Sequence, residues 1–150
     1  MENFDYLIIG GGVVGTSILN KLTRLGGKAC LIEKNSDVGM GASKANSGII
    51  HTGLDCKPNT LKAKLNVKGF NMYPKILDRL NVEYKVNGHL VVGNDLEKIK
   101  ELYNKGVTNG VKDLKIIDGE KLHKEEPYLS DTIKYALYAK NGMIVSSYEL

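Results

Sequence analysis

The sequence predicts an α/β fold that opens with a parallel strand–helix–strand unit, and three observations support this. A short apolar run, Phe4–Ile9, precedes a glycine-rich turn, Gly10–Gly15. Apolar residues then recur every three to four positions as far as Leu25, as in a helix that packs on a sheet. A second apolar run, Ala29–Ile32, ends in the acidic Glu33. This order is typical of the first βαβ unit of a Rossmann-like domain.

The elements that follow are predicted in chain order. The segment Asn35–Gly53 is rich in Gly, Ser and Asn and predicts a long functional loop. Thr60–Leu80 has helical periodicity, with Pro74 expected to kink or break it. In Glu83–Val92 the Asn87-Gly88 pair stands between alternating apolar residues, which predicts a β-hairpin. Shorter patterns predict helices over Leu96–Tyr103 and Gly119–His123, strands over Leu114–Ile117 and Tyr135–Ala139, and the start of a helix at Ser147.

Two regions follow from this order. Residues 1–80 are predicted to be the N-terminal part of a nucleotide-binding domain, and residues 81–150 the start of a mixed α+β substrate or cap region. The nearly continuous apolar run Phe4–Ile9 predicts a strand buried on both faces. Since two parallel strands and one crossover helix bury too little apolar surface to be stable alone, we expect a truncated chain with an incomplete sheet.

Composition narrows the functional classes. The net charge is +4, but lysines are interleaved with acidic residues along most of the chain. A nucleic-acid-binding surface would need clustered Arg and Lys with aromatic residues among them, and the sequence has no such stripe. The two cysteines, Cys30 and Cys56, form no CxxC motif, and Cys30 lies in an apolar run that predicts a buried thiol. The N-terminus lacks the basic, apolar pattern of a secretory signal. We therefore expect a cytoplasmic protein, with any peripheral attachment to the inner face of a membrane made by parts outside this chain.

The glycine turn matches the dinucleotide-binding pattern G-x-G-x-x-G in its required context, between a strand and a helix. Gly10 permits the tight turn, Gly12 lets a pyrophosphate approach the backbone, and Gly15 lets helix and strand pack closely. The helix N-terminus offers free N–H groups to the phosphates. Glu33 stands where an acid accepts hydrogen bonds from the adenosine ribose.

These residues leave NAD and FAD open, because both cofactors carry a ribose with a free 2′-hydroxyl. The loop Ser43–Gly53, rich in small residues, favours a cofactor that lies extended through the protein.

At this point the sequence resembles the D-amino-acid-oxidase-like FAD-dependent oxidoreductases. The resemblance rests on the glycine turn, GASKANSGIIHTGLD, KPNTLKAKLNVKG, EYKVNGHLVVG, EEPYLS and NGMIVSSYEL. Within the family the chain is most similar to anaerobic-type glycerol-3-phosphate dehydrogenases and L-2-hydroxyglutarate oxidases. The resemblance implies FAD as the cofactor and assigns the first region to an incomplete Rossmann-like FAD-binding domain.

The resemblance also implies roles for particular residues. The glycine turn would hold the pyrophosphate, Glu33 and Lys34 would border the adenosine, and Ser43 would lie near the phosphates. The loop after Ser43 would approach the flavin. The implied cofactor-binding residues are Gly10, Gly12, Val14, Gly15, Glu33, Lys34, Ser43, Asn46, Ser47, Gly48 and Ile49.

His51 is the candidate catalytic residue. Beside a flavin, its imidazole could orient a substrate hydroxyl or accept its proton; alternatively, it only hydrogen-bonds the loop backbone or the cofactor. His89 and His123 are expected at the surface, and no histidine has a spacing that predicts a metal site.

The resemblance implies oxidation of a secondary alcohol in a small anionic substrate, with hydride passing to the flavin and electrons leaving to a quinone or a partner electron-transfer subunit. Glycerol 3-phosphate is the first expectation and L-2-hydroxyglutarate the second. Two other readings stay open, namely a flavin-binding module without turnover and an inactive truncated fragment.

Overall fold

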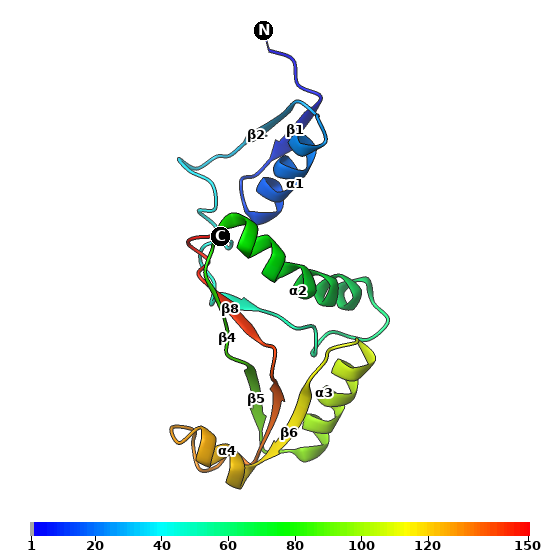
Figure 1. Ribbon diagram of the computed structural model, residues 1–150, viewed down its shortest axis with the longest axis vertical. Helices are drawn as coiled ribbons and strands as arrows, with labels where there is room; N and C mark the ends of the chain where they lie inside the picture. Colours follow the sequence, from blue (N-terminus) through cyan, green and yellow to red (C-terminus); the bar gives the residue numbers. More distant parts are fainter. Residues whose placement is uncertain (1) are drawn as a thin grey trace. The chain divides into compact units, whose positions relative to one another are not determined.

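The computed structural model describes residues 2–150 and confirms the α/β class. The chain forms two compact units that divide between Ser47 and Gly48. The first unit contains β1 (Tyr6–Ile9), α1 (Val13–Arg24) and β2 (Ala29–Ile32) (Figure 1). The second contains β3 (Ile49–Ile50), α2 (Leu61–Leu80), β4 (Tyr84–Val86), β5 (His89–Gly93), α3 (Leu96–Thr108), β6 (Leu114–Asp118), α4 (Gly119–Glu125), β7 (Tyr135–Ala139) and β8 (Met143–Val145).

The first unit is the predicted strand–helix–strand arrangement. Strands β1 and β2 are parallel, with Tyr6 opposite Ala29, and α1 connects them. The prediction that the first strand is buried on both faces is wrong for this chain: Ile8 is buried, whereas Leu7 and Ile9 are 61% and 84% exposed. The reason is that this sheet has only two strands and α1 is the one helix in the described part of its unit, so part of the sheet surface has nothing packed against it.

The second unit is built on a long antiparallel ribbon, which corrects the predicted hairpin. Strands β4 and β5 do not pair with each other; β4 pairs with β8, and β5 pairs with β7. The Asn87-Gly88 pair lies between β4 and β5. The N–H groups of both residues donate to the carbonyl of Gly142, which lies between β7 and β8. Since β4 and β5 pair with different partner strands, the Asn87-Gly88 pair is a bend and not a chain reversal, and Gly88 has φ +77°, which glycine readily adopts.

Two small sheets extend from this ribbon. One has the strand order β3-β8-β4, and the other has β5-β7-β6 (Figure 1). Along β7 the side chains alternate: Leu137 and Ala139 pack with Ile99 of α3, whereas Ala136 packs with Leu122 of α4. Helices α3 and α4 therefore pack against the two faces of the second sheet.

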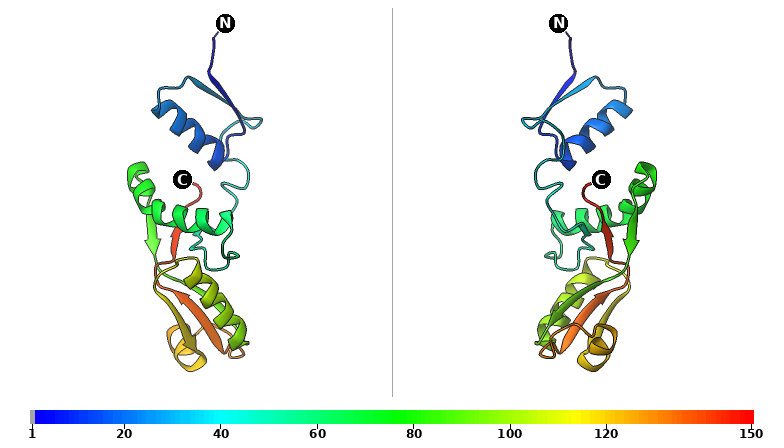
Figure 2. Two further views of the ribbon diagram at one scale, coloured as in Figure 1. Left: turned by 90° about the vertical axis from the view of Figure 1, so that its right-hand side faces the viewer. Right: turned by 90° about the vertical axis from the view of Figure 1, so that its left-hand side faces the viewer.

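Helix α2 covers the other sheet. Leu77, which is fully buried, packs with Ile50 and Met143. The hydroxyl of Thr60 caps the helix start by accepting from the Ala63 N–H at 3.2 Å. The helix continues through Pro74, and Figure 2 shows that it bends along its length, as expected of a helix with an internal proline.

Some boundaries differ from the predictions. Helix α3 runs to Thr108, five residues beyond its predicted end, and the short strands β3 and β8 were not predicted. Residues 147–149 form a turn in place of the expected helix start. The division of the chain into a FAD-binding region, 1–80, and a cap region, 81–150, stays a prediction.

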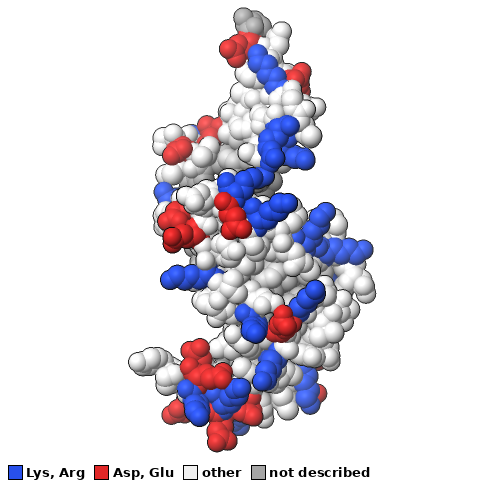
Figure 3. Space-filling model, viewed as in Figure 1, with Lys and Arg blue, Asp and Glu red and all other residues white. Residues whose placement is uncertain are grey.

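Charges of both signs are mixed on the face that Figure 3 shows, and none of the described helices is suited to crossing a membrane. Figure 3 shows lysines and acids interspersed on one face, with both signs gathered around α4. Between residues 2 and 150, none of the helices combines the length and the apolar character that crossing a membrane requires.

Candidate functional site

The glycine turn of the first unit has the geometry that its sequence requires. Gly10 follows β1, donates its N–H to the Ile32 carbonyl at 2.8 Å and has φ +101°, which side-chain-bearing residues rarely adopt. A Cβ at Gly15 would overlap the Gly10 carbonyl oxygen and lie 3.4 Å from Cγ2 of Ile8. Positions 10 and 15 are thus restricted to glycine, and α1 begins in close contact with β1.

The N-terminus of α1 is shaped to receive an anion. The helix begins at Val13, whose N–H donates to the Ser43 hydroxyl at 2.9 Å. A Cβ at Gly12 would meet the same hydroxyl oxygen at 3.2 Å. Gly12, Val14 and Gly15 add further backbone N–H groups at the helix start, and such groups have no partner within the helix. Four predicted residues, with Ser43 among them, therefore meet at the positive end of a helix.

Glu33 lies directly after β2, beside the glycine turn. Its carboxylate accepts hydrogen bonds from the backbone N–H groups of Asn35, at 2.9 Å, and Gly11, at 2.6 Å. These two bonds, that of Asn35 first, lower the pKa of Glu33 below its usual range. The charged carboxylate is thus fixed at the C-terminal end of β2, and the neighbouring Lys34 is exposed.

The lowered pKa of Glu33 predicts a pH-dependent contribution to stability. A group whose pKa falls on folding stabilises the fold above its unfolded pKa, and this contribution disappears as the pH drops through the folded value. We expect the melting temperature of the wild type to fall more steeply than that of Glu33→Gln between about pH 6 and pH 3. Glu101→Gln, on an exposed position of α3, is the control. A constant difference between wild type and Glu33→Gln over this range would contradict the prediction.

The loop that carries Ser43 is held by its own contacts. The side-chain amide of Asn46 donates to the carbonyls of Ala42, at 3.0 Å, and Ser43, at 2.8 Å. Ser47 is exposed. Asn46 therefore positions the Ser43 segment in this structure, and its predicted approach to the flavin stays a prediction.

The other predicted residues belong to the second unit. Gly48 is buried with φ +68°, and its carbonyl accepts from the Val145 N–H at 2.9 Å. Ile49 opens β3 and is 44% exposed, and His51 follows this strand with an exposed side chain. The pairing of β3 with β8 thus fixes the backbone that leads into His51.

His51 lies at a cavity of about 550 Å³ within the second unit. We call it the His51 cavity; it is lined by Ile49, His51, Thr52, Leu54, Asp55, Asn87, Gly88, His89, Leu90, Val91, Leu102 and Ile144. Most of the wall is apolar, and a few polar groups interrupt it, which is the usual composition of a small-molecule site.

His89 was expected at the surface, but it is half-buried and lines the same cavity as His51. Its ring nitrogen Nε2 lies 3.0 Å from the Met143 carbonyl oxygen, which ties β5 to β8. No local pattern predicted this, because the contact joins residues 54 positions apart.

Two other expectations need correction or completion. His123 is half-buried, with Nε2 2.9 Å from the Ile133 carbonyl oxygen. Cys30, predicted to be buried, is only half-buried because its sheet has two strands, whereas Cys56 is buried. Within residues 2–150, no three His, Cys, Asp or Glu side chains are arranged to hold a metal ion.

Comparison with known proteins decides the family. Residues 5–150 match the model of the DAO family, described as FAD dependent oxidoreductase. The chain belongs to this family. A glycerol 3-phosphate dehydrogenase of Caloramator mitchellensis is 46% identical over 97% of this chain and 31% of its own length. A mitochondrial L-2-hydroxyglutarate dehydrogenase of Nematostella vectensis is 35% identical over 96% of this chain and 32% of its own length.

Solved structures agree with this family. The L-alpha-glycerophosphate oxidase of Mycoplasma pneumoniae, solved with FAD bound, superimposes with a TM-score of 0.91 at 30% identity. The match covers 98% of this chain and 40% of that one. The chain thus spans about a third of the length of the curated relatives described above.

FAD, the predicted cofactor, is the cofactor of this family. The first unit fits it on two structural observations: a side chain at Gly12 would crowd the entrance to the α1 N-terminus, and the charged carboxylate of Glu33 is fixed beside that entrance. The contacts of individual residues with FAD stay predictions.

Proposed function

We propose that this chain provides the FAD-pyrophosphate site and part of the substrate site of an enzyme that oxidises a secondary alcohol in a small anionic substrate, with glycerol 3-phosphate as the substrate. The observation that carries the proposal is the α1 N-terminus, where Gly12 and Gly15 keep the approach to the first-turn N–H groups clear, Ser43 accepts from the Val13 N–H, and Glu33 lies alongside. The preference for glycerol 3-phosphate is supported by the relative that shares 46% identity.

The residues of this chain would bind the cofactor, orient the substrate and keep water away from the reacting groups. Bound FAD would supply the oxidation itself by accepting a hydride from the substrate carbon. The first-turn N–H groups of α1 would hold the pyrophosphate, and Glu33 would accept hydrogen bonds from the ribose hydroxyls. The apolar walls of the His51 cavity would exclude water from the reacting groups. Within the cavity, a ring nitrogen of His51 would accept the proton of the substrate hydroxyl.

The role of His51 gives the first kinetic prediction. His51→Asn should lower the rate constant of flavin reduction by about 10²- to 10⁴-fold, the usual range for loss of a general base, while bound flavin is retained. The measurement is the rate of flavin reduction by glycerol 3-phosphate in anaerobic stopped flow. His123→Gln, at a histidine that does not line the His51 cavity, is the matched control and should react at the wild-type rate. A wild-type rate in His51→Asn would leave His51 only a hydrogen-bonding role.

The substrate is tested on the full-length protein that contains this chain. An anaerobic visible spectrum is recorded before and after addition of glycerol 3-phosphate, and bleaching of the oxidised-flavin band is expected. A band that persists with glycerol 3-phosphate but bleaches with L-2-hydroxyglutarate would reassign the substrate, in line with the 35% identical relative. A protein without a flavin band would contradict the FAD site itself.

The electron acceptor and location belong to the same proposal. A quinone or a partner electron-transfer subunit would receive the electrons, in a cytoplasmic enzyme that rests on the inner face of a membrane through parts outside this chain. Reduction of a soluble quinone by the substrate-reduced protein would support this, and reoxidation by oxygen alone would argue for an oxidase.

A further inference from the structure

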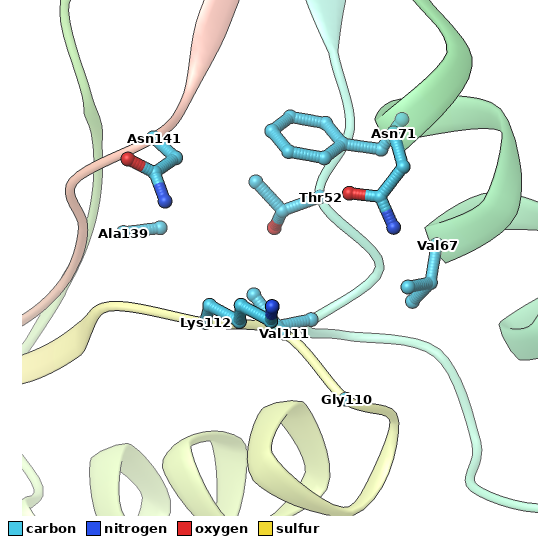
Figure 4. Close-up of a pocket in the computed structure, with 9 residues that line it drawn as sticks. Thr52, Val67, Asn71, Gly110, Val111, Lys112, Ala139 and Asn141 are labelled. Atoms are coloured by element: carbon cyan, nitrogen blue, oxygen red, sulfur yellow. The ribbon is translucent and has the colours of Figure 1, made fainter.

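The second unit contains another hollow, which the proposed reaction does not use. We call it the Lys112 pocket; it has a volume of about 190 Å³. It lies among α2, the segment between α3 and β6, and the turn between β7 and β8 (Figure 4). Its lining residues are Thr52, Val67, Phe70, Asn71, Gly110, Val111, Lys112, Ala139 and Asn141.

Thr52 points to a ligand in this pocket. Its side chain is only 4% exposed, and its hydroxyl has no hydrogen-bond partner among residues 2–150. Figure 4 shows the hydroxyl directed into the hollow. Buried hydroxyl groups in folded proteins nearly always have a partner, because an unsatisfied one is costly. The Thr52 hydroxyl is therefore positioned to bond a molecule that enters the pocket.

The other polar groups are mainly donors. Lys112 brings a positive charge and is exposed at the mouth of the pocket. The Asn141 amide lies beside the hollow in Figure 4; its nitrogen donates to the Asp113 carboxylate at 2.6 Å, and an amide NH₂ group has a second N–H donor. Asn71 adds another amide at the rim. A hydroxyl, an ammonium and two amides form a set that suits an oxygen-rich anion.

We propose that the Lys112 pocket binds a small oxyanion, a phosphate or a carboxylate, beside Thr52, which also lines the His51 cavity. Asp113, beside Asn141, offsets part of the Lys112 charge, so the expected dissociation constant is on the order of 1 mM. Since Thr52 directly follows His51, an anion bonded to Thr52 also restrains the backbone that carries His51. The site does not depend on the proposed function.

The test uses the full-length protein and inorganic phosphate, with acetate as the carboxylate probe. Binding is followed by calorimetry and by the anion-dependent rise in melting temperature. Lys112→Gln should weaken binding about tenfold, because it removes a charge-assisted hydrogen bond. Lys115→Gln, on β6 and outside the pocket lining, is the matched control and should bind as the wild type does.

Thr52→Val gives a second readout that separates binding from folding. Without added anion this variant should melt at or above the wild-type temperature, because it removes an unsatisfied buried hydroxyl. With phosphate or acetate its temperature rise should be smaller than that of the wild type. Equal rises in wild type, Thr52→Val and Lys112→Gln would overturn the proposal.

The same experiment distinguishes this pocket from the His51 cavity. Of these two sites, Lys112 lines the Lys112 pocket and not the His51 cavity, and His51 lines the His51 cavity and not the Lys112 pocket. Phosphate binding that is weakened by His51→Asn and unchanged in Lys112→Gln would place the anion in the His51 cavity and overturn the proposal. Weakening by Lys112→Gln alone supports it, whether or not glycerol 3-phosphate proves to be the substrate.

Discussion

Replacing Gly15 by alanine is expected to abolish stable FAD binding. The new methyl group would overlap the Gly10 carbonyl oxygen, and a backbone atom at the start of the glycine turn cannot move without displacing the turn. Overpacking of this kind costs about 3 kcal/mol. If that cost falls on the cofactor-bound conformation, FAD binds roughly 100-fold more weakly. The ratio of flavin to protein absorbance after gel filtration measures the effect.

Gly41→Ala is the matched control in the same unit. A Cβ at Gly41 meets no atom within 4 Å, and its φ is not positive. We expect its stability to change by less than about 0.5 kcal/mol and its flavin content to match the wild type. Full flavin occupancy in Gly15→Ala would show that the α1 N-terminus is not the pyrophosphate site, whichever substrate the enzyme uses.

The sequence predicted the first unit well because its structure depends on near neighbours. The turn at Gly10, the helix from Val13 and the strand ending before Glu33 all lie within 33 residues, and each has its own local pattern. The glycine geometry follows directly, since positive φ at Gly10 and close contact at Gly15 are properties that only glycine provides.

The second unit was less predictable because its pairings join distant segments. Asn87-Gly88 has the local chemistry of a hairpin turn, yet its N–H groups bond to Gly142, which no local pattern reveals. Strand β3 has only two residues, too few to show a period of two. The hydrogen bond of His89 to Met143 is invisible for the same reason. The cavity around His51 likewise appears only when these segments meet.

Within the candidate site, chemistry could be predicted where a residue type implies a role. Glu33 was placed beside the glycine turn by spacing alone, and the structure fixes it there by hydrogen bonds to backbone N–H groups of Gly11 and Asn35. Those bonds depend on loop conformation, so neither partner could be predicted. Ser43 was placed near the phosphates only through the family resemblance, because 30 residues separate it from Val13.

Gly48→Ala is expected to be the most damaging single change in the second unit. Gly48 has φ +68°, and a Cβ there would overlap the Val145 carbonyl oxygen. The substitution would force apart the segment in which the Val145 N–H donates to the Gly48 carbonyl at 2.9 Å, next to the pairing of β3 with β8. Strained φ costs about 1–2 kcal/mol and the steric overlap about 1–3 kcal/mol more. Chemical denaturation of the full-length protein measures the sum.

Gly39→Ala separates these two costs. Gly39 also has a positive φ, +73°, but a Cβ there meets no atom within 4 Å. Gly39→Ala should lose only the stability that the strained φ costs, about 1–2 kcal/mol. The difference in stability loss between the two variants therefore reports the steric overlap with Val145. Since β3 leads directly into His51, Gly48→Ala should also slow flavin reduction at temperatures where the protein stays folded. Equal losses of stability in the two variants would show that β3 does not approach β8 as described.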